Sequence, residues 1–401
     1  MLKGLKEFGH IALFTYICTA LTLQDMHILQ FERHIYLLVL ATCLLTLPAE
    51  AQEIVIGNYT FKDGAEYQGE LFRGKPYGKG TTTFVNGDTY EGEYVKGKRQ
   101  GQGTYNFVDG ERYEGEWFQD QQHGTGTFYF RNNNKYVGLW FRDFQQGKGT
   151  MYYFNGDRYE GGWEEDEREG QGTYTYAGGD YYRGEWHDDQ KNGLGTFVWS
   201  NGARYSGQWR DGKMNGQGTY NYANGDVYKG GFLNDSLQGK GIYIFNNGDR
   251  YEGTYNKSQR EGDGIFVFAN GNKYVGQFKN GLKHGQGTFT SVDGTSYTGQ
   301  WRNDKKEGRG KYIWRNGDIY DGEWRDGMMD GDGILRQKDG TKFRGQFRQG
   351  EKNGKCVMET PDGIRFEGSY LDGQRDGNFV EKDRNGHVVR RGHYTRGVLD
   401  N

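Results

Sequence analysis

Apolar and polar residues alternate through most of the chain, in a pattern that repeats every 23 residues. In YEGEW, residues 113–117, Tyr113 and Trp117 alternate with two glutamates. Successive side chains of a strand point to opposite faces, so Tyr, Gly and Trp are expected on one face. In GQGTYNF, residues 101–107, the same rule places both glycines, Tyr105 and Phe107 together. Each 23-residue unit therefore predicts two strands.

The aromatic residue that opens the first motif recurs without insertion or deletion, and a glycine always stands two positions after it. The fourteen copies begin at Tyr67, Tyr90, Tyr113, Tyr136, Tyr159, Tyr182, Tyr205, Tyr228, Tyr251, Tyr274, Tyr297, Tyr320, Phe343 and Phe366. Such regular self-similarity indicates a repeat architecture, in which each unit contacts only its neighbours.

Two kinds of connection separate the strands. Between the motifs lies a polar stretch, residues 95–100 in one copy, which predicts a loop. The second motif is followed by Asn-Gly or Asp-Gly, as at Asn86-Gly87 and Asp109-Gly110. These dipeptides accept positive φ at both central positions of a hairpin turn. We therefore expect each repeat to be one hairpin, and tight turns to join neighbours into a continuous antiparallel meander.

Glycine inside a strand is unfavourable unless something packs over it. Here, the missing side chains are expected to let aromatic rings lie flat on the backbone. The predicted structural core of four repeats is Tyr90, Gly92, Tyr113, Gly115, Trp117, Tyr136, Gly138, Trp140, Tyr159, Gly161 and Trp163. The fold class expected is all-β, a single elongated, twisted antiparallel meander of 23-residue β-hairpin repeats.

Composition agrees with packing by aromatic rather than aliphatic side chains, because the 401 residues include 69 glycines, 3 prolines and 16% aromatics. The 51 basic and 54 acidic residues nearly balance, which argues against a nucleic-acid partner. The three cysteines, Cys18, Cys43 and Cys356, provide neither a disulfide framework nor a metal cluster. We expect no cofactor, metal site or catalytic residue, since no P-loop or nucleophile–base grouping is present. His123, His187 and His284 are expected at loop positions of different repeats.

The pattern Y-E-G-x-W, then G-x-G-T-Y-x-F and N-G-D, resembles the MORN repeat, the membrane occupation and recognition nexus, over about residues 57–380. On this reading, residues 52–66 are a leading half repeat, 67–380 are fourteen repeats, and 381–401 are a degenerate C-terminal cap with a basic tail. Phe343 and Phe366 replace Tyr, while Cys356 and Phe379 replace the second glycine of G-x-G. Atypical terminal repeats are expected where a stack must be capped.

The N-terminal 51 residues contain two apolar runs, 11–23 and 35–47, each shorter than the roughly 20 residues of a membrane span. Ala49-Glu50-Ala51 predicts signal-peptide cleavage before Gln52, with translation starting at Met26 or a long leader removed. Cleavage implies a secreted, periplasmic or cell-envelope protein. The alternative is an uncleaved membrane anchor through residues 11–47. The sequons at Asn58, Asn234 and Asn256 matter only in a eukaryotic cell.

The function expected is a non-enzymatic scaffold for protein partners, which the sequence does not identify. The family resemblance implies homodimers through the last repeats, which would place the interface near Phe343, Phe347, Phe366 and Tyr370.

Two alternatives remain open. One is binding of anionic membrane phospholipids through Lys305, Lys306, Arg309, Lys311, Arg390 and Arg391, although Glu307 and Asp383 interrupt these clusters. The other is an extracellular protein that binds a glycan or wall polymer by aromatic stacking.

Overall fold

The computed structural model describes residues 53–400, in which every regular element is a β-strand. No helix within this range is long and apolar enough to cross a bilayer. The apolar runs at 11–23 and 35–47 and the predicted cleavage site lie outside the described residues. The expectations of a signal peptide, an anchor and export therefore remain predictions.

The strands fall into two compact units. The first contains residues 53–85 and 91–98. In it, β1 (Val55–Thr60), β2 (Glu66–Phe72) and β3 (Lys75–Thr83) pair antiparallel in chain order. The Tyr67 ring packs edge-on against Tyr94 at 5.0 Å between centroids, and the Tyr94 hydroxyl is 2.6 Å from the Thr82 hydroxyl. The chain passes between the units after Val85, after Tyr90 within β4 (Thr89–Val95), and after Lys98.

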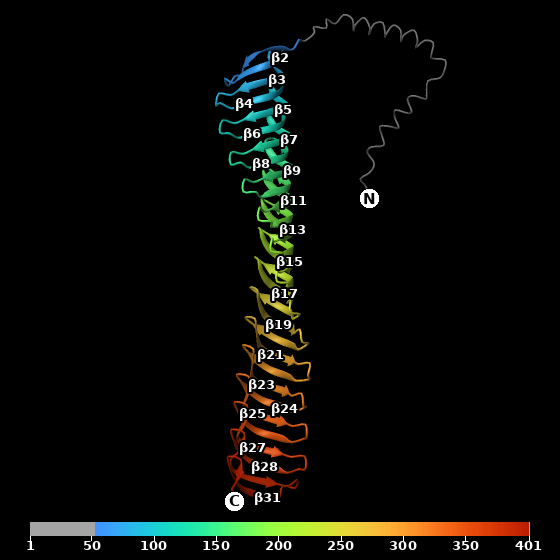
Figure 1. The fold of residues 1–401 in the computed structure, drawn as a ribbon, viewed down its shortest axis with the longest axis vertical. Helices are drawn as coiled ribbons and strands as arrows, with labels where there is room; N and C mark the ends of the chain where they lie inside the picture. The colour runs from blue at the N-terminus through green and yellow to red at the C-terminus, as the bar shows by residue number, and fades with distance from the viewer. Residues whose placement is uncertain (1–52, 401) are drawn as a thin grey trace, which may run out of the picture. The chain divides into compact units, whose positions relative to one another are not determined.

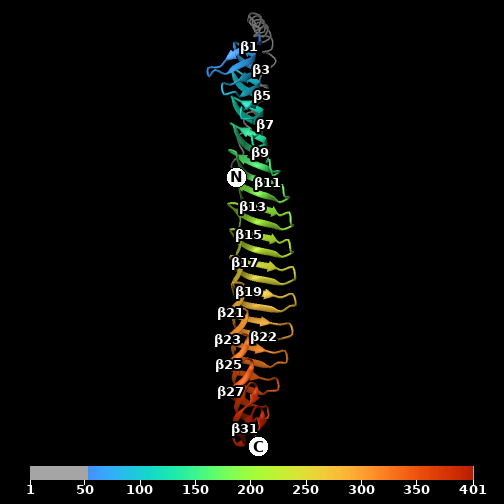
Figure 2. The same cartoon turned by 60° about the vertical axis from the view of Figure 1, so that its left-hand side comes forward.

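The second unit contains residues 86–90 and 99–400. Its strands follow one another in chain order along one direction (Figures 1 and 2), each pairing antiparallel with the next as far as β28. Near the C-terminus β28 pairs with both β29 and β30. The strands are β5 (Lys98–Asn106), β6 (Arg112–Phe118), β7 (Gln121–Tyr129), β8 (Lys135–Phe141), β9 (Phe144–Tyr152), β10 (Arg158–Glu164), β11 (Glu167–Thr175), β12 (Tyr181–His187), β13 (Gln190–Val198), β14 (Arg204–Arg210), β15 (Lys213–Asn221), β16 (Val227–Leu233), β17 (Ser236–Ile244), β18 (Arg250–Asn256), β19 (Gln259–Val267), β20 (Lys273–Lys279), β21 (Leu282–Thr290), β22 (Ser296–Arg302), β23 (Lys305–Ile313), β24 (Ile319–Arg325), β25 (Met328–Arg336), β26 (Lys342–Arg348), β27 (Glu351–Glu359), β28 (Arg365–Leu371), β29 (Gln374–Arg375), β30 (Gly377–Lys382), β31 (Val388–Thr395) and β32 (Val398–Leu399). This arrangement confirms the predicted all-β meander of hairpin repeats.

The opening tyrosine of each repeat covers two glycines, one on each strand of the hairpin, which explains why neither position carries a side chain. Gly115 on β6 and Gly126 on β7 face each other, and the Tyr113 ring lies across both. A Cβ added at Gly126 would stand 2.4 Å from the Tyr113 hydroxyl oxygen. That hydroxyl donates a hydrogen bond of 2.9 Å to the backbone oxygen of Glu116. The prediction that rings lie flat on glycine backbone is confirmed.

The tyrosines and tryptophans of successive repeats form a continuous packed column. Tyr113 meets Trp117 of its own repeat and Trp140 of the next, both edge-on at 5.3 Å between centroids, which is favourable aromatic geometry. In this unit Tyr90, Tyr113, Tyr136 and Tyr159 have 0% exposure, and Trp117, Trp140 and Trp163 have at most 5%. The predicted core tyrosines and tryptophans of this unit therefore lie along this column, and Gly115, Gly138 and Gly161 lie beneath its tyrosines.

The predicted loop at residues 95–100 is too long. The connection there is the two-residue turn Lys96–Gly97, and β5 begins at Lys98. In the next repeat the turn is Gln119–Asp120, with φ of 50° and 73°. Positive φ at both positions matches the twist of the flanking strands. The polar residues thus belong mainly to strand, since a strand of nine residues such as β7 starts immediately after the turn.

The predicted turn at Asn-Gly and Asp-Gly is also wrong in detail. Residues 107–111 form a five-residue loop between β5 and β6, closed by the bond from Gly110 N to Phe107 O. Only Gly110 of the Asp109-Gly110 pair has positive φ, 96°. A β-bulge in β7, where Gly124 has a φ of 59°, accounts for the first glycine of G-x-G.

Candidate binding groove

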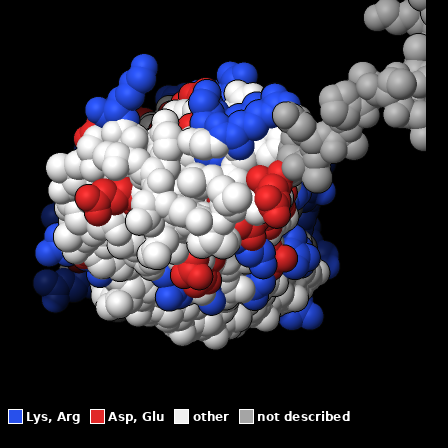
Figure 3. Space-filling model, turned by 90° about the horizontal axis from the view of Figure 1, so that it is seen from above, with Lys and Arg blue, Asp and Glu red and all other residues white. Residues whose placement is uncertain are grey.

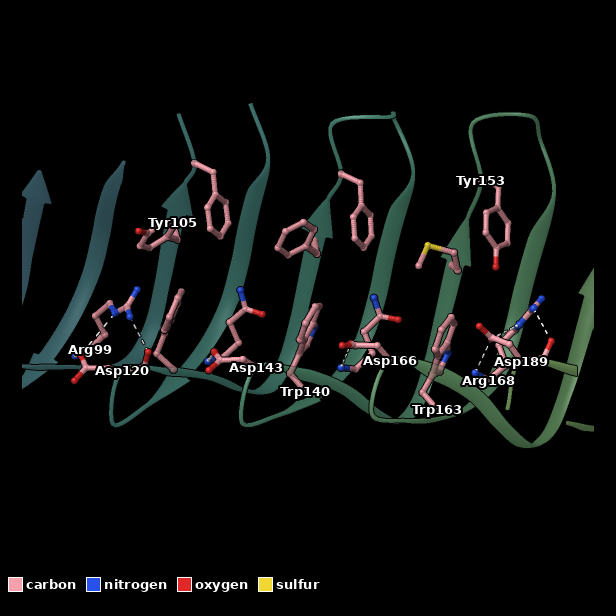
Figure 4. A pocket seen from close by; sticks show the side chains of 17 residues that line it. Arg99, Tyr105, Asp120, Trp140, Asp143, Tyr153, Trp163, Asp166, Arg168 and Asp189 are labelled. Atoms are coloured by element: carbon pink, nitrogen blue, oxygen red, sulfur yellow. Dashed lines mark hydrogen bonds and ion pairs between the residues drawn. The ribbon is translucent and has the colours of Figure 1, made fainter. Parts of the chain in front are cut away.

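An open groove of about 770 Å³ runs over the aromatic face of the second unit, across strands β5 to β13 (Figure 4). Aromatic rings form its floor, and carboxylates stand along the side nearest the two-residue turns. Its lining comprises Arg99, Tyr105, Phe107, Trp117, Asp120, Gln122, Phe128, Phe130, Trp140, Asp143, Gln145, Met151, Tyr153, Trp163, Asp166, Arg168 and Asp189.

The floor is made by the second strand of each repeat and the start of the loop that follows. Phe128 and Phe130 pack with 4.6 Å between centroids, and Phe107 of the preceding repeat lies 5.8 Å from Phe128. Phe107, Phe130 and Tyr153 are half-buried, unlike the fully buried tyrosine column. These rings therefore offer apolar surface to a ligand as well as packing within the sheet.

A basic side chain covers the tryptophan at each end of the groove. The Arg99 guanidinium lies 4.2 Å from the Trp117 ring centroid and donates to the Asp120 backbone oxygen at 2.7 Å. Arg168 lies 4.4 Å from Trp186, and its Nε donates to the Asp189 carboxylate at 2.8 Å. We call each such set of three residues a rung: the residue nine positions after an opening aromatic residue, the tryptophan of the next repeat, and the carboxylate three positions after that tryptophan.

Two rungs between these ends lack the cation, because the equivalent residues are Gln122 and Gln145. Their backbone N–H groups donate to the carboxylates of Asp143 and Asp166 at 2.7 and 2.8 Å. Within residues 53–400, neither carboxylate makes an ion pair.

The glutamine rungs also contain unused polar atoms. Gln145 is 5% exposed, and its Oε1 has no hydrogen-bond partner among the described residues. The buried indole Nε1 atoms of Trp140 and Trp163 likewise have none, but neither has that of Trp186 in the Arg168 rung, so the indoles do not distinguish the glutamine rungs. Buried polar atoms without a partner are rare in native structures, so the Gln145 oxygen is the feature of these rungs that calls for a hydrogen-bond donor.

Further along the same column, lysines cover several aromatic rings. Lys306 Nζ lies 4.1 Å from the Trp324 centroid and 4.2 Å from that of Tyr312. Burial lowers the pKa of Lys306 to about 8. The equivalent of the rung carboxylate is Gly327, so no acidic residue at that position opposes the effect.

The residues predicted to contact anionic lipid occupy different environments. Lys305, Arg309, Lys311, Arg390 and Arg391 are exposed, whereas Lys306 is half-buried in the aromatic column. Lys305 Nζ is 3.0 Å from the Asp326 carboxylate. The Arg390 guanidinium makes two bonds to Glu381, at 2.8 and 3.0 Å. Figure 3 shows the molecule from above, an end view of the N-terminal strands rather than of these residues, in which acidic and basic side chains are interspersed.

The residues predicted for self-association are buried within the chain, with exposures of 1% for Phe343, 4% for Phe347, 1% for Phe366 and 9% for Tyr370. They also pack on one another, as in the edge-on contact of Phe343 and Tyr370 at 5.6 Å between centroids. Their part in dimer formation remains a prediction.

The sequence predicted loop positions for three histidines, and this prediction is wrong. His123, His187 and His284 lie in strands β7, β12 and β21. His187 Nδ1 lies 3.1 Å from a Glu169 carboxylate oxygen, and Nε2 lies 3.7 Å from Asp188. The hydrogen bond to Glu169 and the charge of Asp188 raise the pKa of His187. All three groups are at the surface or half-buried, as expected for a surface ion-pair cluster.

Sequence reasoning treated all the repeated rings as core and missed the groove residues. Phe107 and Phe130 stand at the same spacing in the sequence as buried aromatic residues. That spacing does not show which rings remain partly exposed to solvent. Gln122 and Gln145 do carry a signal, because most repeats have Arg or Lys nine positions after the opening aromatic residue. A comparison of the repeats at that position would have identified the glutamine rungs.

The family model of the MORN repeat matches thirteen consecutive stretches of 23 residues, from 67–89 to 343–365. The fourteenth copy that the spacing predicts, beginning at Phe366, lies beyond these matches. No curated protein sequence matches this chain.

Among solved structures, the TCP10 domain of Danio rerio CPAP is similar at 19% identity, covering 50% of this chain and 99% of that one, with a TM-score of 0.28. The TCP domain of Drosophila melanogaster SAS-4, in complex with a proline-rich motif of Ana2, has 19% identity over 39% of this chain and 85% of that one, with a TM-score of 0.26. Virginiamycin B lyase from Staphylococcus aureus has 11% identity over 77% of this chain and 96% of that one, with a TM-score of 0.12. These low scores carry no argument about function, whereas the thirteen matched repeats establish that the chain belongs to the MORN repeat family.

Proposed function

We propose that this protein is a non-enzymatic scaffold that binds a segment of a partner protein in the groove across β5 to β13. MORN repeats suggest a scaffold for protein or membrane interaction, and their all-β fold is typically non-catalytic. The observation that carries the proposal is a groove of about 770 Å³ that combines half-buried rings with carboxylates and unused hydrogen-bonding atoms.

The composition of the groove suits a peptide. A few buried residues, aromatic ones prominent among them, supply most of the binding free energy at protein interfaces, while a few placed polar groups fix orientation. Phe107, Phe130 and Tyr153 provide the first contribution.

Display of random peptides on phage tests the proposal, with the full-length protein as bait. Selected peptides are expected to lose at least about tenfold in affinity with Phe130→Asp, because a charge replaces a ring of the floor. The matched control is Val137→Asp, which places the same charge on β8 at a side chain that is 40% exposed. Peptides that bind Phe130→Asp as well as the unmodified protein would show that the groove is not the binding site.

The membrane alternative is separated by flotation with liposomes that contain phosphatidylserine. Attraction by Lys305, Arg309 and Lys311 would give binding at low salt that is lost at high salt. Flotation without selection of any groove-binding peptide would favour the membrane function over the scaffold proposed here.

A further inference from the structure

We propose that the two glutamine rungs bind two cationic side chains of the partner segment, with arginine as the best fit. This inference rests on the proposed function and specifies the chemistry of the ligand. It follows from a comparison of the glutamine rungs with the rungs at Arg99 and Arg168.

The arginine rungs show what such a position can hold. In both, a guanidinium covers the tryptophan ring at 4.2 or 4.4 Å and hydrogen-bonds the residue that also supplies the carboxylate. The guanidinium combines stacking on an aromatic face with directed hydrogen bonds, which a lysine ammonium reproduces less well.

The glutamine rungs keep the tryptophan and the carboxylate, and glutamine stands in place of the cation. Trp140 and Trp163 are each 5% exposed, as Trp186 is beneath Arg168, so a ligand guanidinium reaches either ring by displacing the glutamine side chain. No Lys or Arg of residues 53–400 lies over the rings of Trp140 or Trp163. Asp143 and Asp166 make no ion pair in the described part of the chain. Figure 4 shows both carboxylates beside these tryptophans, between the arginine rungs.

The unused oxygen of Gln145 points to the same kind of ligand. Gln145 lines the groove and is 5% exposed, and its Oε1 lacks a partner within residues 53–400. An oxygen acceptor needs a donor, and a guanidinium brings five N–H donors and no acceptor. Two carboxylates and a free carbonyl oxygen therefore select a cationic donor over an anion.

The spacing of the rungs sets the spacing in the ligand. Gln122 is on β7 and Gln145 on β9, two strands apart, so the two positions are separated by about 10 Å. In a polyproline II segment, which rises about 3.1 Å per residue with three residues per turn, that distance corresponds to side chains three residues apart on the same side, and in a helix to about two turns.

The experiment uses full-length protein labelled with ¹⁵N at tryptophan, whose nine indoles all lie in the repeats. The probe is an acetylated and amidated Gly-Ser peptide with two arginines three positions apart. The control peptide has glutamine at both arginine positions. The indole signals of Trp140 and Trp163 are expected to shift with the arginine probe and to stay in place with the glutamine control.

The variant Gln122→Arg/Gln145→Arg fills both rungs with the side chain that the chain itself uses at Arg99 and Arg168, so the fold should tolerate it. We expect it to abolish the shifts. Asp143→Asn/Asp166→Asn removes charge and keeps the oxygen that accepts the backbone bond, and should weaken binding about tenfold or more.

Three results would overturn the inference. Equal shifts with both peptides would leave the groove as a peptide site and remove the requirement for a cation. Undiminished binding to Gln122→Arg/Gln145→Arg would place the probe elsewhere. Absence of shifts with the arginine probe would reject cation binding at these rungs, while the phage selection decides separately whether the groove binds protein segments.

Discussion

The Tyr113 hydroxyl donates to the backbone oxygen of Glu116 at 2.9 Å. To reach it, the ring must cross Gly115 and Gly126, which leaves no room for a Cβ on either strand. The tyrosine and the two glycines of a repeat are thus one packing unit.

Gly126→Ala tests this unit. The new Cβ would lie 2.4 Å from the Tyr113 hydroxyl oxygen, so the ring must move and its hydrogen bond is lost. We expect a loss of local stability of about 1–3 kcal/mol, the usual cost of overpacking. Hydrogen exchange of amides in β6 and β7 measures the local opening free energy without requiring two-state unfolding of a repeat array.

The control for this variant is Gly178→Ala. Gly178 has no atom within 4 Å of an added Cβ and does not need positive φ, so exchange in neighbouring strands should be unchanged. If the amides near Gly126→Ala lost no more protection than those near Gly178→Ala, the position of the Tyr113 ring would not depend on Gly126.

Phe343 and Cys356 depart together from the usual combination of an opening tyrosine and a facing glycine. Cys356 faces Gly345, where other repeats have a second glycine, and the opening residue there is Phe343, which has no hydroxyl. Phe343→Tyr should destabilise its repeat by about 1–3 kcal/mol through crowding. Cys356→Gly should cost about 1 kcal/mol or more, because packing is lost and a flexible residue is introduced.

The double variant Phe343→Tyr/Cys356→Gly recreates the common pair, and we expect it to be more stable than either single variant. A double-mutant cycle of local hydrogen exchange in β26 and β27 measures the coupling. Strict additivity of the two single effects would contradict the proposed packing unit.

Much of this arrangement was readable from the sequence, because the 23-residue spacing and the strand period together assign each aromatic and glycine to a face. The connections were less readable. Positive φ occurs at Gln119 and Asp120, where no Asn-Gly signal exists, because strand twist imposes it. The groove depends on sheet curvature and on which rings remain half-exposed, and a one-dimensional pattern records neither.

Asp226 connects neighbouring repeats and predicts a dependence of stability on acid. Its carboxylate accepts bonds from the Tyr243 hydroxyl and the Asn246 backbone N–H, both at 2.8 Å. Burial alone would raise the pKa of Asp226, but these bonds and one from Asn224 lower it overall. The stabilisation is therefore present above the ordinary carboxyl pKa and is lost as the pH falls through the lowered value.

Asp226→Asn should remove this contribution and cost about 1.5–3 kcal/mol at neutral pH, the range for hydrogen bonds to a charged group. The variant should also lose stability less steeply than the unmodified protein between pH 5 and about pH 2. Urea titrations at several pH values compare the two, and parallel pH profiles would show that Asp226 is not a stabilising ion in the fold.

Lys306 makes the opposite prediction for alkaline pH. Its pKa falls from 10.5 to about 8 on burial, so below pH 8 the folded protein holds a partly desolvated charge that the unfolded chain keeps in water. The unfolded state binds more protons between the two pKa values, so the contribution of Lys306 to stability should rise with pH in that window.

Lys306→Met removes the charge and introduces the residue that the next repeat has at the same position, Met329. We expect this variant to be more stable than the unmodified protein at pH 7, with the difference shrinking toward pH 10. Because the tyrosines whose pKa is raised by burial are common to both proteins, only the difference between their melting temperatures reports on Lys306. A difference that stays constant from pH 7 to 10 would mean that the Trp324 and Tyr312 rings compensate the charge fully.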